Sequence, residues 1–165
     1  MDELTQLAQQ VGAALRARGW MLATAESCTG GWVGEVVTSV SGSSHWYDRG
    51  FITYTNEAKQ EMLGVSAQTL AEFGAVSEQT VREMAAGTLK HSRADITLAI
   101  SGIAGPGGAT PGKPVGTVCM AWAMRDGGHS TTFHFQGDRA EVRRQAVATA
   151  LRGVLGLLEG AVASA

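Results

Sequence analysis

One short polar segment separates a predicted strand from a predicted helix: Ala25-Glu26-Ser27-Cys28-Thr29-Gly30-Gly31. The apolar run Trp20–Ala23 before it is typical of a buried strand, and residues 32–40 after it carry apolar side chains at helical spacing. Such a junction places a hydroxyl group at the carboxyl edge of a sheet, opposite the positive end of a helix dipole. This environment suits either a phosphate group or the oxyanion that forms when a serine attacks an amide.

Ser27 is the predicted nucleophile of this junction. The alternative is that Ser27 or Thr29 only caps the helix, because Ser, Thr and Gly are common where a strand turns into a helix. Cys28 is a second candidate nucleophile, since a thiolate would also be stabilised at this helix end. Sequence alone leaves these possibilities open.

Composition limits the class of protein. The 165 residues carry a formal net charge of −2, with 44% hydrophobic and 17% charged residues, as in an ordinary globular domain. The sequence contains no Lys/Arg-rich run, which argues against nucleic acid or a membrane surface as the main partner. It also contains no signal-peptide core and no apolar run long enough to span a bilayer. The two cysteines, Cys28 and Cys119, lie far apart, and we expect a reduced, cytoplasmic protein.

Apolar periodicity outside the junction predicts alternating strands and helices. Helices are predicted over residues 2–18, from about residues 57, 66 and 77, and after Asp138. Further strands are predicted at residues 51–54, 96–100, 115–124 and 129–135, the last two forming a hairpin. This order predicts an α/β fold: a single layered domain over residues 1–165, with a mixed, mostly parallel sheet flanked by helices. We expect residues 161–165 to be a frayed tail.

Tyr54 and Lys59 form a second group of candidate catalytic residues. Tyr54 ends a predicted strand, and Lys59 falls in the first turn of the next predicted helix. The helix dipole disfavours an ammonium group there, and partial burial would lower the lysine pKa further, which makes Lys59 a better base. Lys59 would then keep Tyr54 poised for deprotonation or take the proton of Ser27 directly. The alternative is an interface tyrosine and a solvated lysine.

Candidate binding residues lie in a Gly-rich turn and in the last helix. The turn follows the predicted central strand, at the sheet edge where α/β proteins bind ligands, and its glycines let backbone N–H groups approach a phosphate or ribose. Arg139 and Arg143 share one face of the last helix and are predicted to grip a phosphate. The alternatives are a flexible loop and a solvated helix face. Histidines and cysteines show no metal-ligand spacing, so we predict no metal site. The turn runs on to Gly108 and begins with Ser101, Gly102, Ile103, Ala104 and Gly105.

Five motifs occur along the chain: Ala25–Gly31, Phe51–Lys59, Gly74–Ser77, Ser101–Gly108 and Lys113–Val118. Together they resemble the C-terminal domain family of the competence/damage-inducible protein CinA. The resemblance covers nearly the whole chain, and each motif alone would be weak. The Gly-rich turn and the late arginine motif of the family fall on the candidate binding residues named above.

The resemblance implies hydrolysis of the carboxamide of nicotinamide mononucleotide to nicotinic acid mononucleotide and ammonia, in pyridine nucleotide recycling. It implies that Ser27, Tyr54 and Lys59 are catalytic, that no metal or cofactor takes part, and that the protein is a homodimer. In this hypothesis Ser27 attacks the carboxamide carbon, Tyr54 with Lys59 carries the proton, and N–H groups near Thr29 and Gly30 stabilise the oxyanion. The alternative is a nucleotide-sensing or partner-binding module that has kept the pocket without turnover.

Overall fold

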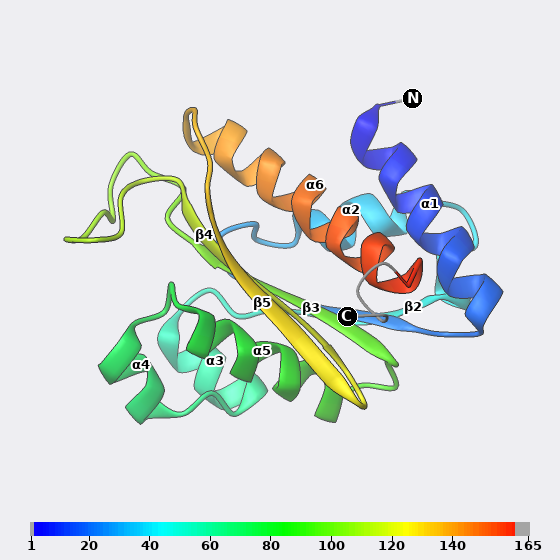
Figure 1. The fold of residues 1–165 in the computed structure, drawn as a ribbon, viewed down its shortest axis with the longest axis horizontal. Helices are drawn as coiled ribbons and strands as arrows, with labels where there is room; N and C mark the ends of the chain where they lie inside the picture. The colour runs from blue at the N-terminus through cyan, green and yellow to red at the C-terminus, as the bar shows by residue number, and fades with distance from the viewer. Residues whose placement is uncertain (1, 161–165) are drawn as a thin grey trace.

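The computed structural model describes residues 2–160 and confirms the α/β class (Figure 1). Five strands form one sheet in the order β2-β1-β3-β4-β5. Strand β1 pairs in parallel with β2 and β3, whereas β4 pairs antiparallel with β3 and β5. The sheet is mixed as predicted: four of the five strands run in one direction, but the pairings divide equally between parallel and antiparallel. The strands are β1 (Leu22–Glu26), β2 (Tyr47–Ile52), β3 (Ile96–Gly102), β4 (Thr117–Met124) and β5 (Gly127–His134).

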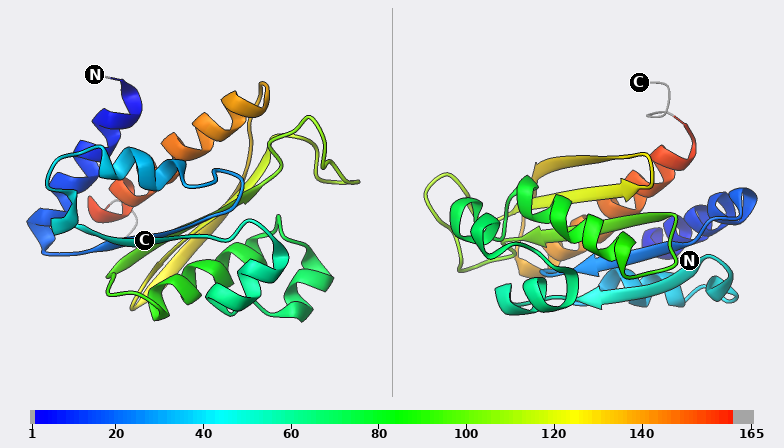
Figure 2. Two further views of the ribbon diagram at one scale, coloured as in Figure 1. Left: turned by 180° about the vertical axis from the view of Figure 1, so that it is seen from behind. Right: turned by 90° about the horizontal axis from the view of Figure 1, so that it is seen from below.

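Helices cover both faces of this sheet (Figure 1). One face carries α1 (Glu3–Arg18), α2 (Trp32–Thr38) and α6 (Arg139–Leu158). The other face, seen from below in the right panel of Figure 2, carries α3 (Asn56–Leu63), α4 (Ala67–Phe73) and α5 (Glu78–Lys90). A short 3-10 helix, η1 (Ser43–His45), precedes β2.

The two faces of the sheet differ in side-chain size. Successive strand residues point to opposite faces, so Leu98 and Ile100 of β3 pack with α1 and α6, whereas Ala99 faces α5. The strand residues on the α5 face are small, and Val81 and Met84 of α5 pack onto this surface. Short side chains let a helix lie close to a sheet, so α5 packs directly over β3 and β4 and also reaches β1. The small strand residues are Ala25, Ala99, Cys119 and Ala121.

Capping residues stabilise the ends of most helices. Asp2 and Asp138 each accept a hydrogen bond from the backbone N–H three residues further on, at 2.8 and 2.9 Å. Gly19 ends α1 in the left-handed conformation, with φ of 68°, which a residue without Cβ adopts at little cost. Three further hydroxyl groups cap α3, α4 and α5: Thr55, Ser66 and Ser77.

Strand limits differ from the prediction at two places near the candidate site. Strand β1 begins at Leu22 and continues to Glu26, because it is paired on both sides and the polar groups of Thr24 and Glu26 find partners. Strand β2 begins at Tyr47, earlier than the predicted start at residue 51. It lies at the edge of the sheet, and polar residues in its first half interrupt the apolar pattern on which the prediction relied. It ends at Ile52, so Tyr54 lies beyond the strand rather than at its last position.

One glycine sets how closely α5 approaches α3. Gly87 lies inside α5, and a Cβ atom there would overlap the carbonyl oxygen of Leu63 at the end of α3. Glycine in a helix costs about 0.5–1 kcal/mol relative to alanine, so the close approach explains its presence.

None of the helices within residues 2–160 is both long and apolar enough to cross a lipid bilayer. The predicted frayed tail, residues 161–165, lies outside the residues that the structure describes.

Candidate active site

The carboxyl ends of the three parallel strands meet at one edge of the sheet, where α/β proteins commonly bind ligands. Ser27 follows β1 directly, and its N–H donates to the Ile100 carbonyl oxygen at 3.0 Å, which extends the pairing of β1 with β3. A cleft of about 290 Å³ opens at this edge. Its lining residues are Ser27, Cys28, Tyr54, Asn56, Lys59, Ala75, Val76, Ser101–Gly105, Gly107, Gly108 and Arg139.

Lys59 reaches Ser27 from helix α3. Its Nζ lies 3.0 Å from Ser27 Oγ, and it also lies 2.9 Å from the carbonyl oxygen of Thr53 and 3.2 Å from that of Tyr54. The segment between β2 and α3 therefore folds back so that both of its carbonyl groups face the amine. The predicted proximity of Ser27 and Lys59 is confirmed by this geometry.

Burial sets the charge preference of Lys59. Its side chain is only 1% exposed, and desolvation lowers its pKa from the ordinary value of 10.5. The structure gives Lys59 no ion pair with a carboxylate of residues 2–160. Burial therefore makes the Lys59 ammonium easier to deprotonate than that of a solvated lysine, which is the direction that a general base requires.

Tyr54 meets Ser27 through its backbone and not through its phenol. Its carbonyl oxygen accepts a hydrogen bond from Lys59 and lies 3.4 Å from Ser27 Oγ. Its side chain is 59% exposed, and its hydroxyl accepts a hydrogen bond from Arg139 at 3.3 Å. The expectation that Lys59 poises the Tyr54 phenol for deprotonation is wrong in this geometry, because the amine contacts the carbonyl oxygen of the same residue.

Glu26 occupies the helix end that the sequence analysis assigned to a ligand. Its carboxylate is 2% exposed and accepts hydrogen bonds at 2.6–3.2 Å from the Thr29 hydroxyl and from the N–H groups of Gly31, Val33 and Gly34. These N–H groups belong to the first turn of α2, where a negative charge is favoured. The expected free helix end beside Ser27 is therefore wrong: Glu26 fills it and thereby fixes the turn that carries Ser27.

Cys28 is a weak alternative nucleophile. Its side chain is buried, and desolvation raises the pKa of its thiol to about 11, with a smaller contribution in the same direction from the negative charge of Glu26. The thiolate is the reactive form of cysteine, so little of it exists at neutral pH. The predicted stabilisation of a Cys28 thiolate is wrong, since Glu26 takes the stabilising N–H groups.

The two arginines of α6 have separate sites. Arg139 lines the cleft, where its guanidinium donates to the carbonyl oxygen of Gly105 at 2.8 Å as well as to Tyr54. Arg143 donates to the carbonyl oxygens of Cys28 and Thr29 at 2.9 and 3.2 Å, and so it holds the backbone of the Ser27 turn. Arg143 does not line the cleft within the described chain. The structure therefore does not bring Arg139 and Arg143 together at one phosphate site.

Comparison with known proteins identifies the family of this chain. A family model described as the CinA C-terminal domain matches residues 4–158. The chain belongs to the CinA C-terminal domain family. The predicted resemblance is confirmed.

Two relatives and two solved structures place the chain within the CinA C-terminal domain family. Nicotinamide-nucleotide amidohydrolase PncC of Escherichia coli K12 is 58% identical over 152 residues, 92% of each protein. The protein of the same name from Pseudomonas putida is 45% identical over 157 residues, 95% of this chain and 98% of the relative. The competence/damage inducible protein CihA from Agrobacterium tumefaciens has a TM-score of 0.92 at 44% identity, covering 95% of this chain and 96% of its own. A CinA superfamily protein from Klebsiella pneumoniae has a TM-score of 0.93 at 42% identity, covering 96% and 99%.

In this CinA-family domain, the turn after Ser27 offers fewer donors than predicted. The N–H of Gly30 donates to the carbonyl oxygen of Ser27 at 3.1 Å, so it is already engaged. The hydroxyl of Thr29 is bonded to Glu26, and neither Thr29 nor Gly30 lines the cleft within the described chain. The Gly-rich turn does line it: Ser101 and Gly102 are the last residues of β3, and the turn continues through Gly105.

Sequence reasoning assigned no role to several residues of the site. Asn56, Ala75 and Val76 line the cleft, and the motif that contains residues 74–77 was the available signal for the last two. The signal for Glu26 was a carboxylate at the end of an otherwise apolar strand, which requires buried partners. Within residues 2–160, no group of three or more His, Cys, Asp or Glu side chains could hold a metal ion; the metal-free reaction stays a prediction.

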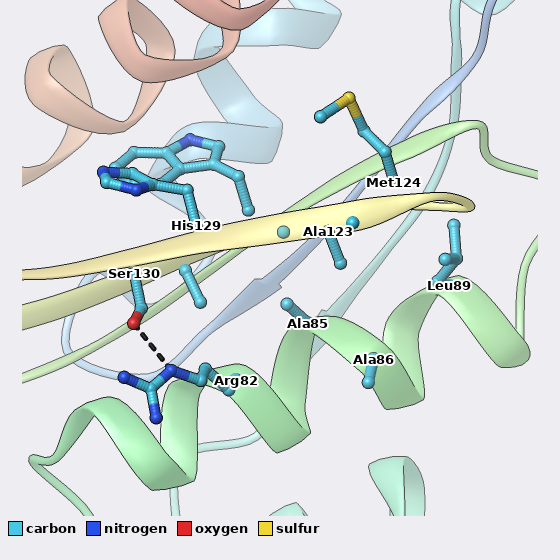
Figure 3. Close-up of a pocket in the computed structure, with 12 residues that line it drawn as sticks. Arg82, Ala85, Ala86, Leu89, Ala123, Met124, His129 and Ser130 are labelled. Carbon is cyan, nitrogen blue, oxygen red and sulfur yellow. Dashed lines mark hydrogen bonds between the residues drawn. The ribbon is translucent and has the colours of Figure 1, made fainter. Parts of the chain in front are cut away.

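A larger cavity of about 590 Å³ lies away from this cleft, between α5 and the β4–β5 hairpin (Figure 3). Alanine, leucine and methionine side chains form most of its wall, and Arg82 donates to Ser130 Oγ at 2.7 Å at one end. The hydroxyl of Ser130 also donates to Glu78, and no lysine lines this cavity in the described chain. The Ser27 cleft therefore remains the candidate active site of this CinA-family domain.

Proposed function

We propose that this protein is a nicotinamide-nucleotide amidohydrolase that cleaves the carboxamide of nicotinamide mononucleotide. Relatives that carry this name match 92% or more of the chain at 45–58% identity. The observation that carries the mechanism is the 3.0 Å contact between Ser27 Oγ and a buried Lys59 amine in the cleft. A hydroxyl within hydrogen-bond reach of a neutral base is the arrangement that activates a serine nucleophile.

The surroundings of Lys59 satisfy both of its protonation states. A neutral amine donates two hydrogen bonds, to the carbonyl oxygens of Thr53 and Tyr54, and its lone pair accepts the Ser27 proton. An ammonium group donates three hydrogen bonds, to the same two carbonyl oxygens and to Ser27 Oγ. Lys59 therefore takes up and returns a proton without losing a partner, which supports Lys59 rather than the Tyr54 phenol as the immediate base.

The reaction then proceeds in two halves. Ser27 Oγ attacks the carboxamide carbon while Lys59 takes the hydroxyl proton, which gives a tetrahedral intermediate. Lys59 returns this proton to the amide nitrogen, the C–N bond breaks, and ammonia leaves an ester on Ser27. Water attacks the ester, Lys59 accepts a proton from it and passes that proton to Ser27 Oγ, and nicotinic acid mononucleotide is released.

Backbone and guanidinium groups supply the remaining charge stabilisation in this proposal. Because Gly30 N–H is engaged and Thr29 does not line the cleft within the described chain, we assign the oxyanion to the N–H groups of the Gly-rich turn at Ala104 and Gly105. Arg139 lines the cleft and forms no ion pair within residues 2–160, so we assign it to the substrate phosphate. A role in pyridine nucleotide recycling, a cytoplasmic location and a homodimeric state are part of the same proposal.

The test is release of ammonia from nicotinamide mononucleotide by the purified protein, with nicotinic acid mononucleotide measured by chromatography. Ser27→Ala should lower turnover by at least about 1,000-fold, because the nucleophile is lost. Cys28→Ala is the matched control and should keep most of the activity. Circular dichroism and a thermal melt of both variants check that the fold is retained.

Other results of these assays would reassign the nucleophile or the function. Near-normal turnover of Ser27→Ala would remove Ser27 as the nucleophile, and loss of activity in Cys28→Ala alone would assign that role to the thiol. Binding of nicotinamide mononucleotide by the wild-type protein without any ammonia would favour the alternative of a nucleotide sensor without turnover.

A further inference from the structure

Tyr54 is the one aromatic side chain among the cleft-lining residues of the described chain. The residue is 59% exposed, although large aromatic residues usually bury most of their surface. Its backbone carbonyl oxygen already serves Lys59, so the position beside the base does not explain why the side chain is aromatic.

The hydroxyl contact fixes the ring at the wall of the cleft. Arg139 donates to the Tyr54 hydroxyl at 3.3 Å and to the carbonyl oxygen of Gly105 at 2.8 Å, so one guanidinium ties the phenol to the Gly-rich turn. The contact is made at the oxygen atom of Tyr54 and leaves the ring itself exposed. Val76 and Ile103 line the same cleft and add aliphatic surface.

The chemistry of an oxidised nicotinamide ring matches such a wall. The ring nitrogen carries the glycosidic bond, so the ring is a planar pyridinium cation, and an aromatic face attracts a cation through its quadrupole. We propose that the ring of Tyr54 binds the pyridinium ring of the substrate, and so selects oxidised over reduced nicotinamide nucleotides. The inference rests on the proposed function for the identity of the substrate.

The test measures binding rather than turnover, so that it does not depend on catalysis. Calorimetric titration of Ser27→Ala with nicotinamide mononucleotide provides the reference Kd, and reduced nicotinamide mononucleotide, whose dihydropyridine ring is neutral, is the second probe. Adding Tyr54→Leu should raise the Kd of the oxidised form roughly 10-fold and that of the reduced form by much less. Adding Tyr54→Phe, which keeps the ring, should change the oxidised Kd by less than about 3-fold. Phe73→Leu is a matched control, since it removes a half-exposed aromatic ring outside the cleft.

Three outcomes would overturn the inference. The first is an unchanged Kd in the Tyr54→Leu variant. The second is an equal loss of affinity for the oxidised and reduced forms, which would indicate apolar contact without charge recognition. The third is the same loss in the Phe and Leu variants, which would assign the contact to the hydroxyl. Failure of the proposed function is seen separately, as wild-type protein that binds nicotinamide mononucleotide and releases no ammonia.

Discussion

Replacement of Glu26 by glutamine tests the role of this buried carboxylate in holding the Ser27 turn. Glutamine has nearly the same shape but offers one acceptor oxygen in place of two. If that oxygen keeps the place of Glu26 Oε1, the glutamine NH₂ group faces the N–H of Gly34, which donates to Oε2 at 3.0 Å in the native protein. Two donors then oppose each other in a buried site.

The expected loss of stability follows from the four hydrogen bonds. A buried N–H left without an acceptor costs about 1–3 kcal/mol, and a bond to a charged acceptor contributes about 1 kcal/mol more than one to a neutral acceptor. One donor is lost and the other three bonds lose their charge assistance, so Glu26→Gln should lower the free energy of unfolding by about 4–6 kcal/mol. For a chain of this length, that corresponds to a fall in Tm of roughly 10–20 °C.

Urea denaturation followed by circular dichroism at pH 7 measures the difference. The matched control is Glu35→Gln in α2, the helix whose N-terminus Glu26 caps; the Glu35 side chain is exposed and the change should stay within about 0.5 kcal/mol. If Glu26→Gln unfolds within about 1 kcal/mol of the wild type, the carboxylate does not organise this turn and the assignment is refuted. A variant that is destabilised as expected should also lose turnover, because Ser27 is the residue next to the one replaced.

Three further changes are predicted. Because burial places the pKa of Lys59 below 10.5, kcat/KM should rise with pH up to a midpoint below that value. Lys59→Arg, which stays protonated, should lose at least about 100-fold in kcat. A wild-type pH profile in which kcat/KM does not rise with pH would contradict a lysine base. Gly87→Ala should lower the free energy of unfolding by about 1–3 kcal/mol in urea titrations, because the new Cβ overlaps the Leu63 carbonyl oxygen. Gly156→Ala, with open space around its Cβ position, should raise the free energy of unfolding by about 0.5–1 kcal/mol. Equal effects of the two changes would mean that close packing does not decide whether alanine stabilises or destabilises the helix. Arg139→Met should raise the KM for nicotinamide mononucleotide roughly 10-fold or more and change the KM for nicotinamide riboside far less. Steady-state assays with both substrates measure the difference. A similar rise in KM for both substrates would exclude a contact between Arg139 and the phosphate.

The sequence by itself determined the class of fold and the helix ends. Period-2 and period-3.6 apolar patterns reflect which face of each element is buried, and caps such as Asp138 act within one turn of the chain. Both signals are local, so they are readable without knowledge of the neighbours. The motifs around Ser27 and Lys59 also indicated the site, because the carboxyl ends of parallel strands meet at one edge of a sheet.

Tertiary structure decided the strand limits and the partners of each polar group. Strand β1 extends to Glu26 because neighbours pair with it on both sides, and the carboxylate then captures the helix N–H groups that local reasoning left for a ligand. The backbone of Tyr54, and not its phenol, meets the amine, and Arg143 serves the turn while Arg139 serves the cleft. These choices depend on distances between segments far apart in sequence. Residue type states which hydrogen bonds a group is able to form, and only packing decides which of them it forms.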